Sequence, residues 1–151
     1  MPAVSPLRTL IVDESETFLL GAALWMEDRP ELIVVGSART GPEAVAAVDR
    51  LLPDLVILDA VLPELDGFRV TRLIKTRPQA PLVVIATFLT SSAAREEALA
   101  AGADGFLAKD DFAEGLEGLL GELTGSADLP SKQVTSPQKP VRPGSRSARD
   151  L

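Results

Sequence analysis

The chain has 151 residues, 46% of them hydrophobic and 25% charged, so it is long enough to bury one core of ordinary size. It contains no cysteine and no histidine, which excludes disulfides, thiolate or imidazole metal sites, serine–histidine hydrolysis and a phosphohistidine on this chain. Residues 1–125 carry 10 Lys and Arg against 20 Asp and Glu, and this net charge of −10 disfavours direct binding of nucleic acid.

Short apolar runs alternate with longer helical patterns along residues 8–124. In chain order, we predict strand 10–12, helix 15–27, strand 32–35, helix 41–52, strand 55–58, helix 68–77, strand 82–86, helix 91–101, strand 105–108 and helix 112–124. The strands are continuously apolar, which is typical of parallel strands covered on both faces. The predicted fold class is therefore α/β, a doubly wound five-stranded parallel sheet with helices on both faces; a mixed α+β domain is the alternative.

The pattern ends near residue 125, which we take as the end of the domain. Residues 126–151 contain four prolines and five serines and have a net charge of +3, so we expect a disordered, basic, Pro/Ser-rich tail. No apolar run approaches the ~18 residues of a membrane span. Residues 1–7 show no secretion signal, so we expect a cytoplasmic protein without membrane contact.

Polar residues follow four of the predicted strands. Asp13 and Glu14 follow the first strand, Asp59 the third, Thr87 the fourth and Lys109 the fifth. Parallel strands end at one edge of the sheet, where ligands bind, so these side chains are expected to converge. Close carboxylates need a cation, and oxygen ligands suit Mg²⁺, whereas the lysine and the hydroxyl suit an anionic group. This combination indicates phosphoryl transfer.

Each of these residues also has an ordinary structural alternative. Asp13 and Glu14 could cap the following helix, and Asp59 could form a turn. Thr87 could simply end its strand, and Lys109 could be a solvated charge. The convergence of all of them at one edge favours the functional interpretation.

The chain resembles the receiver domains of two-component response regulators over about residues 8–124. The resemblance rests on VDE at 12–14, DAVLPELDG at 59–67, Thr87, and AGADGFLAKDD at 101–111. An aspartate after Lys109, where many receivers have proline, resembles the NarL/LuxR-like branch. In this resemblance, Pro63 and Gly67 shape the loop that follows Asp59.

The resemblance implies a phosphorylation switch. It implies that Asp59 is the phosphoacceptor, which receives its phosphoryl group from a partner sensor histidine kinase. It implies that Asp13 and Glu14 bind Mg²⁺ together with Asp59 and the carbonyl of Val61. The domain itself is then not an enzyme.

The resemblance also implies that Thr87 and Lys109 bind the phosphoryl oxygens, and that Phe106 is the switch aromatic. The chain departs from the family in three places. Glu14 replaces the usual second Asp, Phe88 follows Thr87 where a small residue is usual, and Phe106 lacks a hydroxyl. These departures keep open the alternative of a pseudo-receiver, an interaction module that works without phosphorylation.

Two enzymatic or ligand-binding alternatives are disfavoured. A phosphatase with an aspartate nucleophile commonly has a second Asp two residues later, and this chain has Val61 there. A dinucleotide-binding domain needs a G-x-G-x-x-G after the first strand, and the sequence DESETF has no glycine.

Helix 15–27 is predicted to expose an apolar surface. At 100° per residue, the side facing the core is expected to hold Phe18, Gly21, Ala22 and Trp25. The opposite side is expected to hold Leu19, Leu20, Ala23 and Leu24. With the leucines of helix 112–124 (Leu116, Leu119, Leu120 and Leu123), this side predicts a homodimer or output-partner contact; scattered exposed leucines without a role are the alternative.

Overall fold

The computed structural model describes residues 5–124, so the expected tail at 126–151 lies outside the described residues. The described chain divides into two compact units, one that ends at Asp111 and one that begins at Phe112. The strands are β1 (Leu7–Val12), β2 (Leu32–Ala38), β3 (Leu55–Leu58), β4 (Leu82–Thr87) and β5 (Gly105–Ala108). The helices of the first unit are α1 (Glu16–Glu27), α2 (Gly41–Leu51), α3 (Gly67–Ile74) and α4 (Ser92–Ala100), and the second unit contains α5 (Phe112–Thr124).

All five strands belong to one parallel sheet with the order β2-β1-β3-β4-β5. This is the doubly wound α/β fold expected from the sequence. The strand order reverses beside β1, and a sheet of this kind binds ligands outside its carboxyl edge at such a point. In register, Val12 of β1 lies beside Leu58 of β3, and Thr87 of β4 lies beside Ala108 of β5.

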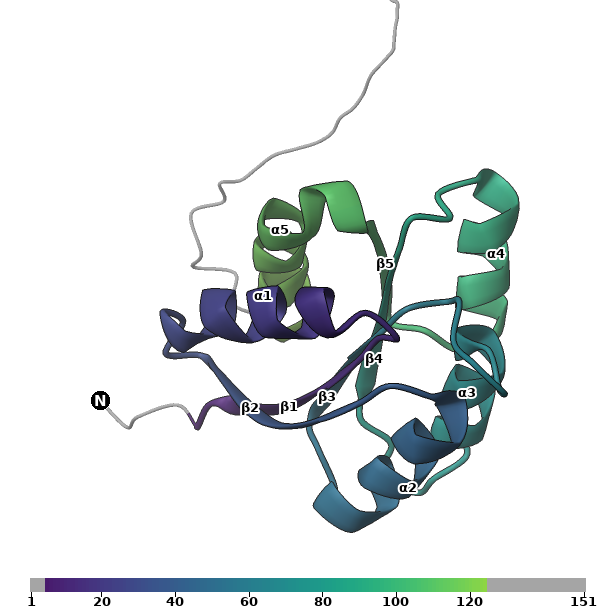
Figure 1. Ribbon diagram of the computed structural model, residues 1–151, viewed down its shortest axis with the longest axis horizontal. Coiled ribbons are helices and arrows are strands. Elements are labelled where there is room, and N and C mark those ends of the chain that lie inside the picture. Colours follow the sequence, from purple (N-terminus) through teal and green to yellow (C-terminus); the bar gives the residue numbers. More distant parts are fainter. Residues whose placement is uncertain (1–4, 125–151) are drawn as a thin grey trace, which may run out of the picture. The chain divides into compact units, whose positions relative to one another are not determined.

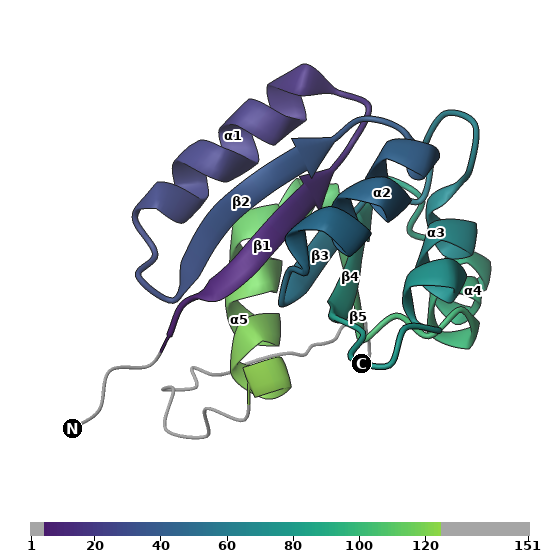
Figure 2. The ribbon, with the colours of Figure 1, turned by 90° about the horizontal axis from the view of Figure 1, so that it is seen from below.

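The helices of the first unit cover both faces of the sheet. Figure 1 shows α1 on one face and α2, α3 and α4 on the other, and Figure 2 shows the same separation from below. On the second face, Leu10, Val56 and Ile85 join the buried cluster that Phe68 and Ile74 of α3 complete. Because strand residues alternate between faces, the inner strands are apolar over Leu10–Val12 in β1, the whole of β3, and Leu82–Ala86 in β4, as predicted.

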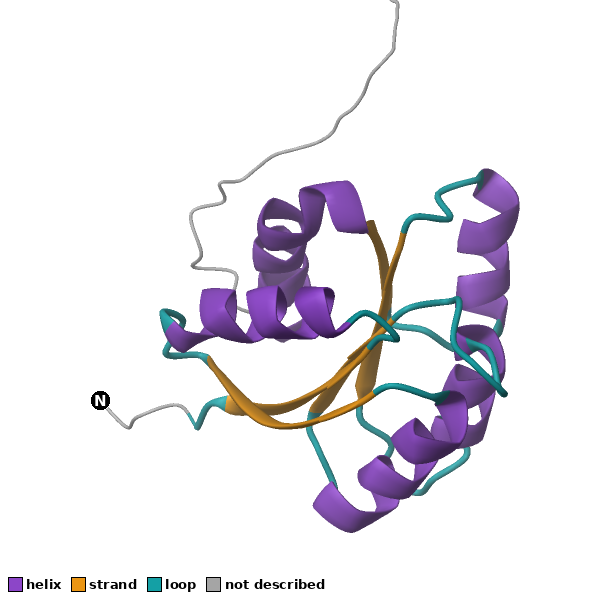
Figure 3. Ribbon diagram, in the orientation of Figure 1, coloured by secondary structure: helices purple, strands orange, loops and turns teal. Residues whose placement is uncertain are grey.

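The helix boundaries follow from capping. The side chains that cap α1, α2, α3 and α4 at their first turns belong to Ser15, Thr40, Asp66 and Ser91. Helix α3 ends at Ile74, earlier than the predicted residue 77. From Thr76 on, the hydrogen bonds reach back three residues instead of four, because the N–H groups of Thr76 and Arg77 donate to the carbonyls of Leu73 and Ile74. Figure 3 shows the strands and helices that alternate along the chain.

The predicted buried face of α1 is wrong, because the observed buried residues are displaced from the predicted ones by about one position along the helix. Its buried residues are Leu19, Ala22 and Met26, whereas Gly21 is exposed and Trp25 is only half-buried. Leu19 therefore faces the core and not the solvent. Helix α1 has apolar residues on most of its sides. Several different faces of it therefore show apolar residues spaced three and four apart, and periodicity alone did not identify the buried one.

The prediction for Leu20 and Leu24 is confirmed, because these side chains are 62% and 63% exposed. The leucines of α5 do not form an exposed set. Leu116 and Leu120 are buried, and Leu119 and Leu123 are half-buried. Within residues 5–124, every helix is too short or too polar to span a lipid bilayer.

Candidate functional site at the carboxyl edge of the sheet

Two carboxylates lie side by side where β1 and β3 end. Asp13 follows Val12, Asp59 follows Leu58, and these two strand residues are register partners. The Asp59 N–H donates to the Val12 carbonyl at 3.1 Å, which extends the strand pairing to the acid itself. Both acids are buried. The sheet therefore brings together the two acids that follow its central strands, at the point where the strand order reverses.

Lys109 joins the two acids from the end of β5. Its ammonium lies 2.6 Å from Asp13 Oδ2 and 3.0 Å from Asp59 Oδ2, and its side chain is 6% exposed. Burial by itself lowers the pKa of Lys109, but the hydrogen bonds to Asp13 and Asp59 outweigh burial and raise the pKa above its usual value. The lysine is therefore charged at neutral pH and offsets the repulsion between the two carboxylates.

The second carboxylate oxygen of each acid, Oδ1, accepts a hydrogen bond from a backbone N–H group. Asp13 Oδ1 accepts from the Ser15 N–H at 2.9 Å, and Asp59 Oδ1 accepts from the Val61 N–H at 3.3 Å. Asp13 Oδ2 is buried and receives no well-aligned hydrogen bond from the residues that the structure describes. This buried oxygen, beside a second carboxylate, is the kind of ligand that a hard cation prefers.

Glu14 stands apart from this cluster. Its side chain is exposed, and in the described part of the chain no group of three acidic side chains is arranged to hold a metal ion. The backbone of Glu14 is held from another element, because Nε and Nη2 of Arg39 donate to its carbonyl at 3.0 and 2.8 Å. Arg39 thus fixes the loop that carries Asp13 and Glu14.

Sequence reasoning missed Arg39, although a signal was available. Arg39 directly follows β2, so the rule that selected the other strand-end residues also selects it. The predicted strand ends at residue 35, whereas β2 extends to Ala38, so the sequence pattern did not place Arg39 at a strand end.

Thr87 and Phe106 lie on neighbouring strands but contact different groups. The Thr87 hydroxyl is buried and accepts from the Leu89 N–H at 3.2 Å; between residues 5 and 124 no hydrogen bond joins it to Asp59 or Lys109. The Phe106 ring is buried under the guanidinium of Arg95, which lies 5.0 Å from the ring centroid. Arg95 comes from α4, so this contact links β5 to that helix.

The loop after Asp59 is tightly packed. The Gly67 N–H donates to the Ala60 carbonyl at 2.8 Å, and a Cβ on Gly67 would lie against the carbonyl oxygen of Asp59. The Pro63 carbonyl accepts from the N–H groups of Gly41 and Leu65. The proline and the glycine therefore shape this loop, as the motif predicted.

The family model described as response regulator receiver domain matches residues 9–118, which is more than half of the chain. The chain belongs to this family. The receiver domain of NarL from Mycobacterium tuberculosis has a TM-score of 0.73 and 25% identity to this chain, covering 83% of this chain and 99% of that one. A LuxR-family response regulator from Aurantimonas sp. SI85-9A1 has a TM-score of 0.74 and 31% identity, covering 84% of this chain and 94% of that one.

Among curated proteins, the chain is similar to the protein-glutamate methylesterase/protein-glutamine glutaminase of Alkalilimnicola ehrlichii. The two are 33% identical over 95% of this chain, but this chain spans only 39% of the length of that protein. These matches confirm the receiver family and its NarL/LuxR-like structural neighbours. The receiver domain thus occurs both in LuxR-family regulators and in a methylesterase.

Proposed function

We propose that this receiver domain is switched by phosphorylation of Asp59. The observation that carries the proposal is the position of Asp59 beside Asp13, with the buried Lys109 ammonium 3.0 Å from its Oδ2. In the transfer, a carboxylate oxygen of Asp59 attacks the phosphorus of a phosphohistidine on a sensor histidine kinase. The phosphorus–nitrogen bond breaks, its electron pair returns to the imidazole, and an acyl phosphate forms on Asp59.

Mg²⁺ is the proposed cofactor of this site. Asp13, Asp59 and the Val61 carbonyl would hold it, with Glu14 as the further acid. The buried Asp13 Oδ2, which pairs with the Lys109 ammonium but receives no well-aligned hydrogen bond in the described residues, supports this choice, because such a carboxylate oxygen suits a hard cation. When bound, Mg²⁺ offsets the negative charge of the carboxylates and of the incoming phosphoryl group.

Thr87 and Lys109 are the proposed ligands of the transferred phosphoryl group. Transfer adds about two negative charges next to Lys109, which already lies within 3.0 Å of the acceptor oxygen. The Thr87 hydroxyl would exchange its bond with the Leu89 N–H for one to a phosphoryl oxygen. Phe106 lies on β5, the strand that pairs with the strand of Thr87, and would respond by repacking under Arg95, because it has no hydroxyl.

The domain passes on its signal, in this proposal, through protein contacts and not through its own catalysis or nucleic-acid binding. We place its boundary at residue 125, ahead of the basic tail at 126–151. We place the exchange in the cytoplasm, where ATP supplies the kinase. A pseudo-receiver is disfavoured, because Asp13, Asp59 and Lys109 all keep their positions and contacts.

Incubation with acetyl phosphate and Mg²⁺ is expected to add one phosphoryl group to the wild type and none to Asp59→Asn. The amide keeps the shape of the side chain but cannot act as the nucleophile. Intact-mass measurement separates the two species. The matched control is Asp54→Asn, an acid at the opposite end of β3 that accepts from the Arg8 N–H, and it should label like the wild type. Label on Asp59→Asn would contradict the assignment.

We also propose that the exposed Leu20 and Leu24 of α1 form the contact with a second copy or an output partner. Burying these side chains against a partner would remove apolar surface from water. Sedimentation at increasing concentration should show association of the wild type, and Leu20→Glu/Leu24→Glu should stay monomeric. The exposed Leu99 of α4 provides the control variant Leu99→Glu. A wild type that stays monomeric would exclude a second copy as the occupant of this surface and leave only contact with an output partner.

A further inference from the structure

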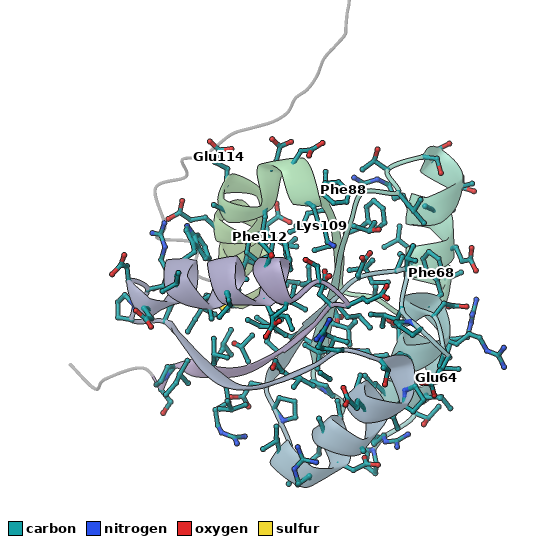
Figure 4. The ribbon with its side chains drawn as sticks, viewed as in Figure 1. Glu64, Phe68, Phe88, Lys109, Phe112 and Glu114 are labelled. Atoms are coloured by element: carbon teal, nitrogen blue, oxygen red, sulfur yellow. The ribbon has the colours of Figure 1, made fainter. Side chains whose placement is uncertain are left out.

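The aromatic ring of Phe88 lies over the lysine of the site. Phe88 directly follows β4, and its ring centroid is 5.1 Å from Lys109 Nζ, as the labelled side chains in Figure 4 illustrate. A second ring, that of Phe18 on α1, lies 4.6 Å from the same nitrogen. The ammonium is thus in contact with two carboxylates and two aromatic faces, and such contacts are attractive.

The two rings differ in how firmly they are held. Phe18 is half-buried within the first turn of α1, and its N–H donates to the capping Ser15 hydroxyl at 3.1 Å. Phe88 is 67% exposed and belongs to the irregular segment between β4 and α4. The Phe88 ring can therefore leave Lys109 without disturbing a helix or the core, whereas the half-buried Phe18 ring is carried by the regular helix α1.

The groups near Phe88 are nearly closed to solvent. The side chains of Asp13, Asp59 and Lys109 are 2%, 12% and 6% exposed, so an incoming phosphoryl group needs an opening at this edge. The nearby Val61 and Leu89 are exposed and apolar, and neither can bind an anion or orient water. An exposed phenylalanine in contact with the lysine is the group best placed to control this access.

We propose that Phe88 is a movable cover of the phosphorylation site, which restricts the access of small phosphodonors and of water to Asp59. The proposal rests on the proposed function of Asp59 as the phosphoacceptor. A small anionic donor gains nothing from the exposed ring and must displace it from Lys109 first. Phe88 thereby determines which class of phosphodonor the domain accepts.

Both reactions of Asp59 pass through the same opening. With acetyl phosphate, a carboxylate oxygen of Asp59 attacks phosphorus, the phosphorus–oxygen bond to the acetyl group breaks, and acetate leaves with the electron pair. In hydrolysis, a water oxygen attacks phosphorus, the electron pair of the broken bond returns to the Asp59 carboxylate, and inorganic phosphate carries away the oxygen. A cover slows both reactions, whereas a ring that only positions Lys109 speeds the first.

The experiment compares wild type, Phe88→Ala, Phe88→Leu and the control Leu99→Ala in Mg²⁺. Intact mass gives the rate of labelling by acetyl phosphate and, after removal of the donor, the rate of loss of the label. Phe88→Ala is expected to raise both rates about tenfold, equivalent to about 1.4 kcal/mol of activation free energy. Phe88→Leu should lie between, because it keeps apolar bulk but loses the ring, and Leu99→Ala should match the wild type.

Equal rates of labelling and loss in Phe88→Ala and wild type would overturn the proposal that Phe88 covers the site. They would not affect the assignment of Asp59 as the phosphoacceptor. A slower labelling of Phe88→Ala with an unchanged loss rate would also overturn it, because the ring would then position Lys109. Absence of label in every variant would overturn the proposed function together with the cover. Circular dichroism of each variant verifies folding, which an exposed side chain is not expected to affect.

Discussion

Replacing Lys109 by methionine is expected to lower the free energy of unfolding by about 3–5 kcal/mol at neutral pH, because it leaves two buried carboxylates without their cation. The ammonium lies within 3.0 Å of both Asp13 Oδ2 and Asp59 Oδ2. Urea denaturation without divalent cations measures the loss. The expected loss is large because the lysine is buried, and water therefore screens the repulsion between the carboxylates only weakly.

The half-exposed pair of Lys75 and Asp104 provides the matched control. Its two atoms are 2.8 Å apart, so its geometry is as close as that of the buried cluster. Lys75→Met should nevertheless cost only about 1 kcal/mol, because solvent screens such a pair. The double variant Lys109→Met/Asp13→Asn should recover about 1–3 kcal/mol relative to Lys109→Met, since it removes one of the two unpaired charges. Equal losses in Lys109→Met and Lys75→Met would contradict the view that burial decides the effect.

The pH dependence follows from the direction of the Lys109 shift. Hydrogen bonds to Asp13 and Asp59 raise the pKa of Lys109 above its usual 10.5, despite the opposing effect of burial. A group whose pKa is higher in the folded state stabilises that state fully below the unfolded pKa. On the alkaline side, the contribution of the ammonium is therefore retained up to about pH 10.5 and is lost as the pH rises through the raised value. Above neutral pH, the difference in the free energy of unfolding between wild type and Lys109→Met should narrow only when the pH reaches that alkaline range.

The parallel sheet and its order of elements were predictable because each inner strand is apolar on both faces. Leu55–Leu58 is such a strand, and Gly105–Ala108 is largely buried although it forms the edge opposite β2; the predicted boundaries of both agree with the structure. The edge strand β2 was harder to delimit. It is exposed at Ile33 and continues through Gly36 and Ser37, residues that carry no apolar signal. Its length is set by pairing with β1, which a local pattern does not contain.

The strand-end rule also accounts for what was predictable in the site. It selected Asp13, Asp59 and Lys109, because a parallel sheet brings successive strand ends to one edge whatever the helices do. It also selected Glu14, but the structure leaves the Glu14 side chain exposed, whereas the adjacent Asp13 is buried. The roles predicted for Thr87 and Phe106 stay predictions.

The contacts that sequence reasoning missed all come from side chains that approach from a different element. Phe18 was predicted to face the core from α1, but its ring lies against Lys109. Arg39 reaches the Glu14 carbonyl, and Arg95 reaches the Phe106 ring. The position of such a long or aromatic side chain depends on the angle between elements. No spacing along the chain encodes that angle, so these contacts required the structure.

Replacing Gly67 by alanine is expected to destabilise the protein and to disturb Asp59 itself. The added Cβ would lie against the carbonyl oxygen of Asp59 and 2.8 Å from Ala60 Cα. Both neighbours are backbone atoms of the chain leaving β3, so no flexible side chain can yield. Overpacking of this kind costs about 1–3 kcal/mol and more where backbone must move. Urea denaturation should show this loss, and labelling by acetyl phosphate should slow as the loop of Asp59 shifts.

Gly21→Ala is the control for this substitution, because it makes the same chemical change where there is room. A Cβ on Gly21 would have no neighbour within 4 Å, and the residue lies inside α1. Removing a glycine from a helix interior should stabilise the protein by about 0.5–1 kcal/mol, so the two variants should differ in sign. A Gly67→Ala protein with wild-type stability and labelling would show that α3 can move away from Asp59 freely. In that case, the glycine of the LDG sequence at 65–67 would not be needed to position the phosphoacceptor. A loss of both stability and labelling rate would instead show that this glycine helps to place Asp59.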